Sequence, residues 1–305
     1  MADNDNNWSM SVRIRTDPFS WGTKKPSWDV LRLDECHPVV SGNKLYKLEP
    51  FLARAFQEGR PGIVTFGGPY SNHIHATAFA AQAAGLPAIG IIRGEQPPHC
   101  SPTLADAQEW GMQLRYLSRE RYKALHRDPN AYTAEIPPRW LVVPEGGYTR
   151  EGAQGAKKML DGIPTERYDR IVCACGTGTM AAGLRMAAHP RTAVIGIPVL
   201  KGHGGLENDI HSLIPEEERQ GAMTMIDGYH FGGYAKKNLA LLQFMKRFYL
   251  ASGIQTDFVY TAKLMFAVDD LFRNGYFHNK ERILAIHSGG LQGNRSLKNL
   301  SLTSS

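Results

Sequence analysis

Two lysines, Lys44 and Lys47, stand three residues apart within residues 42–49 (GNKLYKLE). On a helix this spacing brings both amines to one side. A lysine amine can form a Schiff base with the aldehyde group of a cofactor when burial or a neighbouring cation lowers its pKa. The alternative interpretation is a solvated helix face, which is the usual environment of a pair of lysines.

The segment at residues 175–179 (CGTGT) combines glycines with hydroxyl side chains. Gly176 and Gly178 allow backbone N–H groups to converge on an anion, and Thr177 and Thr179 add hydroxyl donors. The helix predicted to follow adds the positive end of its dipole, so the segment suits a phosphate group. A tight strand-to-helix turn without a ligand is the alternative. The segment lacks the Gly-Lys-Ser/Thr of a Walker loop.

Ser71, Asn72 and His73 stand at the start of another predicted helix. Exposed N–H groups at a helix N-terminus, together with polar side chains, suit a carboxylate. The alternative is that Ser71 is an ordinary N-cap residue. His73 and His75 are two residues apart and face different ways on a helix, so no metal site is predicted there.

Composition narrows the class of protein. Of the 305 residues, 42% are hydrophobic and 21% are charged, which is typical of a globular protein. The net charge of +6 is spread over the chain without a run of basic residues, so it favours a small anionic ligand and predicts no nucleic-acid partner. Four cysteines are too few for a disulfide scaffold, and Cys173 and Cys175 lack the spacing of a zinc-binding pair.

Two segments bear on localisation. Residues 1–7 (MADNDNN) are polar and acidic, unlike a secretion signal. The longest stretch without Asp, Glu, Lys or Arg, residues 61–92, is interrupted by glycines, prolines and polar side chains, unlike a membrane span. We therefore expect a cytoplasmic protein with reduced thiols and no membrane partner.

Short apolar segments alternate with helix-like segments along most of the chain. This alternation indicates an α/β fold in which helices cover both faces of parallel sheets. The predicted strands are residues 62–66, 88–92, 114–117, 140–143, 170–174, 193–199 and 282–286. The predicted helices are residues 71–84, 102–110, 179–188, 238–250 and 264–272.

Glycine-rich turns follow four of the predicted strands. In open parallel sheets, ligands bind at the carboxyl ends of the strands. We therefore expect the ligand site where these turns meet. The turns are residues 67–73, 175–179, 201–205 and 287–290.

Several of these segments occur together, and in this order, in one known family. The chain resembles the D-cysteine desulfhydrase / 1-aminocyclopropane-1-carboxylate deaminase family of pyridoxal-phosphate enzymes, over roughly residues 10–300. The segments that carry the resemblance are residues 42–49 (GNKLYKLE), 67–73 (GGPYSNH), 176–179 (GTGT) and 259–263 (VYTAK).

The resemblance implies an architecture. It is the tryptophan-synthase-β-like fold type II, an α/β fold with two open, twisted, mostly parallel sheets flanked by helices. Residues 1–50 and 160–305 would form a large cofactor-binding domain, and residues 51–159 a small α/β domain. The active site would lie in the cleft between the two domains, and the protein would be a homodimer.

The resemblance also implies cofactor contacts. Lys44 would carry pyridoxal 5'-phosphate as a Schiff base, and Lys47 would lie near the cofactor phosphate. Asn72 would donate a hydrogen bond to the cofactor's phenolic oxygen. The phosphate loop would consist of Gly176, Thr177, Gly178 and Thr179.

Substrate contacts follow from the same resemblance. Ser71, with the backbone of Asn72 and His73, would hold the substrate carboxylate. Tyr234 and Tyr260 match two active-site tyrosines, either of which would act near the leaving group or the carboxylate. Taken without the resemblance, Tyr260 reads as a residue that packs at the start of an apolar helix.

Thr261 occupies a position at which the cyclopropane deaminases have a glutamate facing the pyridine nitrogen. A hydroxyl group leaves that nitrogen closer to neutral and weakens the cofactor as an electron sink. A weaker sink suffices when the substrate carries a good β leaving group such as thiolate, but it suits cyclopropane opening poorly. Thr261 is therefore a predicted cofactor contact that favours a desulfhydrase.

The predicted reaction is β-elimination from a small amino acid, with D-cysteine giving pyruvate, sulfide and ammonia. The alternatives are a 1-aminocyclopropane-1-carboxylate deaminase and a lyase for another β-substituted amino acid. An alternative of a different class is a pyridoxal-phosphate carrier without catalysis. The predicted carboxylate site argues against a carrier, which needs no substrate contacts.

Overall fold

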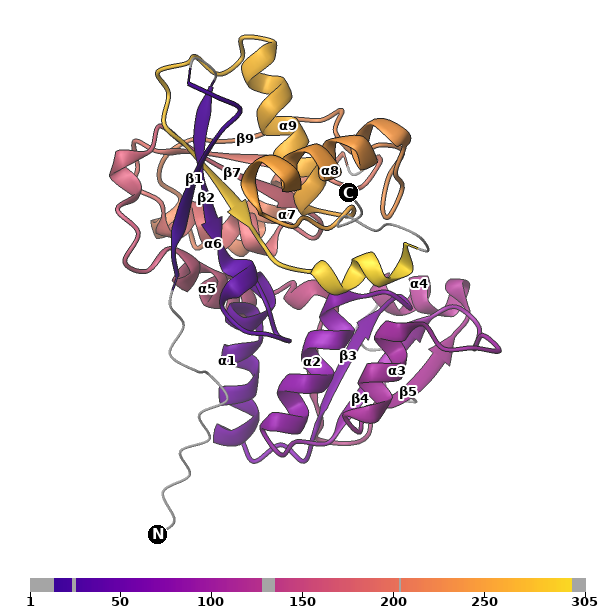
Figure 1. The fold of residues 1–305 in the computed structure, drawn as a ribbon. Helices are drawn as coiled ribbons and strands as arrows, with labels where there is room; N and C mark the ends of the chain where they lie inside the picture. The colour runs from indigo at the N-terminus through magenta and orange to yellow at the C-terminus, as the bar shows by residue number, and fades with distance from the viewer. Residues whose placement is uncertain (1–13, 24–25, 128–134, 203, 298–305) are drawn as a thin grey trace.

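The structure is a computed structural model that describes residues 14–23, 26–127, 135–202 and 204–297. Two sheets with helices packed on them make up the fold (Figure 1). The predicted fold class, two mostly parallel sheets flanked by helices, is confirmed. The acidic segment at residues 1–7 lies outside the described residues. No helix in the described ranges is long and apolar enough to cross a bilayer.

The larger sheet has six strands, and its central strands are buried on both faces. The edge strand β1 runs antiparallel to β2, and the remaining neighbours are parallel. In spatial order the strands are β1 (Thr16–Ser20), β2 (Ser27–Arg32), β10 (Ile283–His287), β7 (Arg170–Cys175), β8 (Ala193–Pro198) and β9 (Met223–Met225).

The smaller sheet has four strands, all parallel. Its central strands are buried along nearly their whole length, as continuous apolar segments predict. In spatial order the strands are β5 (Gln113–Leu117), β4 (Ala88–Arg93), β3 (Ile63–Gly67) and β6 (Leu141–Val143).

Helices cover both sheets, and several begin at a side chain that caps free N–H groups. Ser101 accepts a hydrogen bond from the Leu104 N–H, and Pro102 follows it at the first helical position, as the sequence predicts. The α-helices are α1 (Asn43–Gln57), α2 (Asn72–Ala83), α3 (Pro102–Glu109), α4 (Arg119–Arg127), α5 (Arg150–Lys157), α6 (Thr179–Ala187), α7 (Leu206–Leu213), α8 (Leu239–Ser252) and α9 (Thr261–Arg273).

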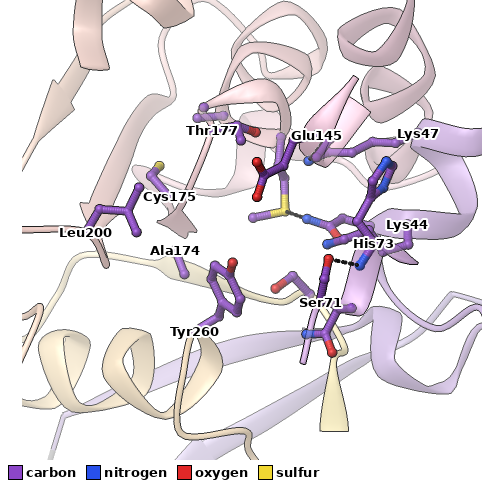
Figure 2. A pocket seen from close by; sticks show the side chains of 18 of the residues that line it. Lys44, Lys47, Ser71, His73, Glu145, Ala174, Cys175, Thr177, Leu200 and Tyr260 are labelled. Carbon is purple, nitrogen blue, oxygen red and sulfur yellow. Dashed lines mark hydrogen bonds between the residues drawn. The ribbon is translucent and has the colours of Figure 1, made fainter. Parts of the chain in front are cut away.

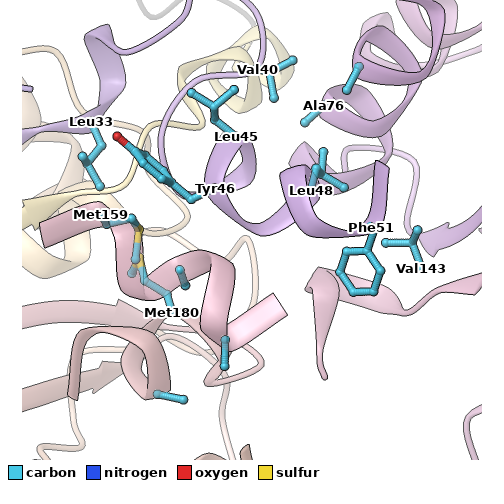
Figure 3. Close-up of a cluster of buried hydrophobic side chains, with 14 of the residues drawn as sticks. Leu33, Val40, Leu45, Tyr46, Leu48, Phe51, Ala76, Val143, Met159 and Met180 are labelled. Carbon is cyan, nitrogen blue, oxygen red and sulfur yellow. The ribbon is translucent and has the colours of Figure 1, made fainter. Parts of the chain in front are cut away.

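One apolar core runs from the larger sheet to the smaller one through α1, α5 and α6 (Figure 3). Tyr46 and Phe51 of α1 both belong to it. Glycines let the helices approach closely, because a Cβ on Gly155 of α5 would lie 2.2 Å from the Tyr46 carbonyl oxygen. The helix α1 therefore joins the two sheets and carries Lys44 at its first turn.

The two sheets draw on different parts of the chain. Strands of the larger sheet come from residues 16–32 and 170–287, and strands of the smaller sheet from residues 63–143. The domain boundary expected after residue 50 falls inside α1. The domain division itself stays a prediction.

Candidate active site

A cavity of about 300 Å³ opens where the carboxyl ends of strands from both sheets meet (Figure 2). Turns after β3, β6, β7 and β10 contribute to its wall, together with the first turn of α1. Among the predicted site residues, the cavity is lined by Lys44, Lys47, Ser71, Asn72, His73, Gly176, Thr177, Gly178, Tyr234 and Tyr260.

Two predicted site residues do not line this cavity. Thr179 is completely buried, and its hydroxyl lies 3.0 Å from the Thr177 hydroxyl, which does line the cavity. Thr261 is completely buried, and its hydroxyl donates to the Asp257 carboxylate at 2.8 Å. Their direct contacts with a cofactor stay predictions.

Lys44 extends into the cavity from the first turn of α1. Its ammonium group donates to the Asn43 side-chain oxygen at 2.7 Å, and no carboxylate in the described ranges forms an ion pair with it. Desolvation lowers the pKa of Lys44 to about 8, and the negative charge of Asp257 opposes this shift. A neutral amine is therefore accessible near neutral pH, as attack on an aldehyde requires.

Lys47 lies one turn further along α1 and is 4% exposed. Its ammonium group donates to the Gly146 carbonyl at 3.3 Å. Burial and the neighbouring charge of Lys44 hold the pKa of Lys47 well below its usual range. A buried amine with one weak carbonyl partner is stabilised by an anion, and a phosphate group supplies that charge.

The turn from β7 to α6 fits a phosphate. Gly178 is the N-cap residue of α6 with a φ of 82°, and no side chain caps the helix start. A Cβ at this position would lie 2.5 Å from Ile210. The uncapped N–H groups of α6 and the Thr177 hydroxyl therefore open toward the cavity that contains Lys47.

Ser71 caps α2. Its hydroxyl oxygen accepts hydrogen bonds from the N–H groups of His73 at 3.2 Å and Ile74 at 3.3 Å. The His73 N–H is thus already bonded, in contrast to its predicted role as a carboxylate donor. The Ser71 hydroxyl proton and the Asn72 N–H, at the first position of the helix, remain available for a carboxylate.

The orientation of Asn72 is set by the 3-10 helix η7 (Leu291–Ser296). The Gln292 amide donates to the Asn72 side-chain oxygen, and the Thr103 hydroxyl donates to the Gln292 oxygen at 2.8 Å. This chain of bonds identifies the Asn72 NH₂ as the end of the amide that is left to donate to a ligand.

Tyr234 and Tyr260 stand together on the side of the cavity formed by the larger sheet. Their ring centroids are 6.3 Å apart at 70°. Burial raises the pKa of Tyr234, and it raises the pKa of Tyr260 well above its usual range. Both phenols therefore stay protonated at neutral pH and act as hydrogen-bond donors.

His73 is buried, and neither ring nitrogen has a hydrogen-bond partner within the described parts of the chain. Burial, together with the charges of Lys44 and Lys47, lowers the pKa of His73 to about 3, against a small opposing effect of the Pro144 carbonyl. The imidazole is therefore neutral at working pH and can donate or accept a hydrogen bond in the cavity.

This shift predicts a loss of stability in acid. Below pH 6.5 the unfolded chain protonates His73 while the folded protein does not, so the free energy of unfolding falls as the pH drops toward 3. Between pH 7 and pH 5, the wild type should lose about 2 kcal/mol more than His73→Gln in denaturant titrations. The exposed His211→Gln is the control and should behave like the wild type. Equal acid sensitivity of His73→Gln and wild type would contradict this.

The cavity also contains residues that the sequence did not single out. Arg93 ends β4, and Glu145 follows β6, where its carboxylate accepts from the Tyr122 hydroxyl at 2.8 Å. Both occupy carboxyl ends of strands, so the rule that located the glycine-rich turns could have identified them. The other additions to the wall are Gly146, Ala174, Met180, Ala181 and Leu200, and the segments noted in the sequence also contribute Asn43, Cys175, Ser288 and Gly289.

The arrangement fits a phosphate-bearing aldehyde. One end of the cavity has the buried amine of Lys47 and an uncapped helix start, and the wall has Lys44, whose pKa is lowered. Polar groups that suit a carboxylate, from Ser71 and Asn72, lie in the same wall. A cofactor that carries both an aldehyde and a phosphate, and a substrate with a carboxylate, both find complementary groups here.

Comparison with known proteins agrees with this geometry. A Thermotoga maritima protein named as a putative 1-aminocyclopropane-1-carboxylate deaminase is 30% identical over 284 residues, covering 87% of this chain and 88% of the relative. A D-cysteine desulfhydrase of Salmonella choleraesuis is 27% identical over 282 residues, covering 85% and 86%. A solved structure of an ACC deaminase homologue is 29% identical with a TM-score of 0.74, covering 88% and 86%.

The family of pyridoxal-phosphate dependent enzymes matches residues 30–289. The match includes Lys44, the turn at residues 176–179, and the strand β10 with the two residues after it. The predicted resemblance, the fold type and the pyridoxal-phosphate cofactor are thereby confirmed. By its sequence, its fold and the residues of its cavity, the chain belongs to the family of pyridoxal-phosphate-dependent enzymes.

Proposed function

We propose that the protein catalyses β-elimination from a small amino acid, with D-cysteine giving pyruvate, hydrogen sulfide and ammonia with the uptake of one water. The observation that supports this most is the presence of Lys44, the phosphate-suited turn and the polar groups of Ser71 and Asn72 in one cavity. Relatives of this chain include proteins named D-cysteine desulfhydrase.

In this proposal Lys44 attaches the cofactor covalently, and the cofactor draws electrons from the substrate's α-carbon. Gly176, Thr177 and Gly178 bind its phosphate, Lys47 neutralises that charge, and Asn72 donates to its phenolic oxygen. These are the residues through which the protein would hold the group before any substrate arrives.

The substrate's carboxylate accepts hydrogen bonds from the Ser71 hydroxyl and the Asn72 N–H. Lys44, once released from the cofactor, removes the α-proton, since its pKa of about 8 suits an amine that must alternate between base and acid. The β-thiolate leaves toward Tyr234 or Tyr260, whose protonated phenols stabilise the departing negative charge.

Thr261 supports elimination over cyclopropane opening. Its hydroxyl is hydrogen-bonded to Asp257, and that carboxylate already accepts from the N–H groups of Val259, Tyr260 and Thr261. The Asp257 carboxylate therefore has its acceptor positions taken up by these four bonds and is not left to accept from a pyridine nitrogen. The weaker electron sink that results is adequate for a good leaving group.

Arg93 favours a second candidate substrate. Its guanidinium lies over the Tyr122 ring at 5.8 Å and beside Gly68, and it forms no ion pair with a described residue. A free cation next to the predicted carboxylate turn suits an amino acid whose β-carbon carries a second anionic group, such as O-phospho-D-serine.

The proposal includes the surroundings of the site. Residues 1–50 and 160–305 form the cofactor-binding domain and residues 51–159 the small domain, consistent with the separate origin of the two sheets. The protein works in the cytoplasm as a homodimer on a small amino acid, with no nucleic-acid or membrane partner.

The test is release of sulfide and keto acid by the purified, cofactor-loaded protein. D-cysteine, L-cysteine, O-phospho-D-serine and 1-aminocyclopropane-1-carboxylate are offered in parallel. Sulfide and pyruvate in equal amounts are expected from D-cysteine. Pyruvate from the phosphorylated substrate at a higher rate would favour the second candidate. 2-Oxobutyrate from the cyclopropane substrate alone would replace the proposal with a deaminase, and no product from any substrate would refute it.

A further inference from the structure

The turn that carries Tyr234 has an unusual backbone. Phe231 and Ala235 have φ values of 52° and 53°, and Gly232 and Gly233 between them have 98° and 123°. Positive φ is unfavourable for a residue with a side chain, and within the described ranges Arg139 is the only other non-glycine residue with one. Such a conformation persists only when the surrounding structure enforces it.

The helix α9 holds this turn at three points along its length. The Lys263 ammonium group donates to the carbonyls of His230 at 2.9 Å and Gly233 at 2.8 Å. The Phe231 ring packs edge-on against Phe266, with centroids 5.0 Å apart. The Tyr229 hydroxyl, at the start of the turn, donates to Asp270 at 2.8 Å.

Lys263 is the contact that needs an explanation. Its side chain is completely buried, and an ammonium group is costly to bury unless it is well hydrogen-bonded. No carboxylate in the described residues forms an ion pair with it, although the charge of Asp257 offsets part of the desolvation that lowers its pKa to about 8. An apolar side chain at this position of α9 would be buried at a lower free-energy cost. What the lysine provides in addition is its two hydrogen bonds to the carbonyls of the turn.

We propose that Lys263 is a positioning residue that holds the turn at residues 230–233 in the conformation that places the Tyr234 phenol in the cavity. Tyr234 is 38% exposed, and its ring lies against that of Tyr260 with the centroids 6.3 Å apart, so the position of the phenol depends on the backbone of the turn as well as on Tyr260. The orientation of a substrate-side phenol is thereby controlled from the buried face of α9. The inference rests on the proposed function in one respect, the action of Tyr234 on the substrate.

The first test is a double-mutant cycle between Lys263→Met and Tyr234→Phe, read as kcat/KM. Lys263→Met should lower kcat/KM about tenfold in the wild type and less than about twofold when Tyr234 is already phenylalanine. The two losses do not add because both changes remove the same interaction, that of the Tyr234 phenol with the substrate. The visible absorbance of the bound cofactor should be the same in all four proteins. The same fold-loss in both backgrounds would overturn the proposal.

The matched control is Lys246→Met on the exposed side of α8. It removes a lysine charge without touching the turn, and it should leave kcat/KM unchanged in either background. If Lys263→Met does not fold, Lys263→Gln takes its place, since the glutamine amide has lost the charge but can still donate to a carbonyl. It should show the same coupling with a smaller loss.

The second test is independent of turnover. Hydrogen exchange at residues 229–235 should be at least about tenfold faster in Lys263→Met than in the wild type, and unchanged in Lys246→Met. If the wild type released no product from any substrate, the proposed function would fail. Faster exchange in Lys263→Met would still support the role of Lys263 in holding the turn. Unchanged exchange at this turn would overturn the role of Lys263 whatever the substrate proves to be.

Discussion

Replacing Lys44 with alanine is expected to lower turnover by at least about 10³-fold and to remove the visible absorbance of the covalently attached cofactor. The loss is large because, in the proposed mechanism, one amine serves as the attachment point and as the base for the α-proton. Lys44 is suited to both tasks, since its pKa is lowered to about 8 and its ammonium group has no carboxylate partner in the described residues. Absorbance spectra and keto-acid assays measure the two effects separately.

Lys158→Ala is the control for this change. Lys158 is exposed and forms an ion pair with Glu49 at 3.0 Å, away from the cavity. Removing an exposed ion pair should cost less than about 1 kcal/mol and leave the spectrum unchanged. Normal turnover in Lys44→Ala would refute the assignment of Lys44.

Replacing Gly42 with alanine is expected to destabilise the protein by about 3 kcal/mol or more and to prevent cofactor attachment. Gly42 precedes α1 with φ 69° and ψ −148°, a region open almost only to glycine. A Cβ there would lie 1.8 Å from the Ser288 carbonyl oxygen, which accepts a hydrogen bond from the Asn43 N–H. The added methyl group must push the start of α1, and Lys44 with it, away from the end of β10.

Gly59→Ala separates strain from steric contact. Gly59 has a φ of 58°, but no atom lies within 4 Å of a Cβ built on it. This variant should lose about 1 kcal/mol through the backbone alone and keep the cofactor. Denaturant titrations and cofactor absorbance test both variants. Equal losses of stability in the two variants, or a Gly42→Ala protein that still binds the cofactor, would show that the contact with Ser288 does not cause the predicted loss.

Much of the fold could be predicted from local sequence. Continuous apolar segments of about five residues suit only strands that are covered on both faces. The segments predicted at residues 88–92, 170–174 and 282–286 are the central strands β4, β7 and β10, within one or two residues. The helix predicted after Ser101 begins as expected, because serine and proline act within a single turn.

The elements that escaped prediction depend on the partners they pack against rather than on their own sequence. The strand β1 contains Pro18 and polar residues, and it exists because it pairs with β2 at the edge of the larger sheet. The helix α5 contains Gly152 and Gly155, which lower helix propensity. A Cβ on Gly155 would lie 2.2 Å from the Tyr46 carbonyl of α1, and one on Gly152 would lie 2.1 Å from the Gly147 carbonyl, so packing overrides local preference.

For the site, the sequence by itself determined which residues have the chemistry: a lysine in a Gly-Asn-Lys motif, a glycine–threonine turn and a capped Ser-Asn helix start. Each of these motifs depends on residues that are adjacent in the sequence, so a local pattern is enough to find it. Only the tertiary structure decided that Arg93 and Glu145 share their cavity, that the Thr261 hydroxyl is committed to Asp257, and that Lys263 holds the turn of Tyr234. Those contacts arise where strand ends and helix faces from distant segments meet, and their geometry is set by packing.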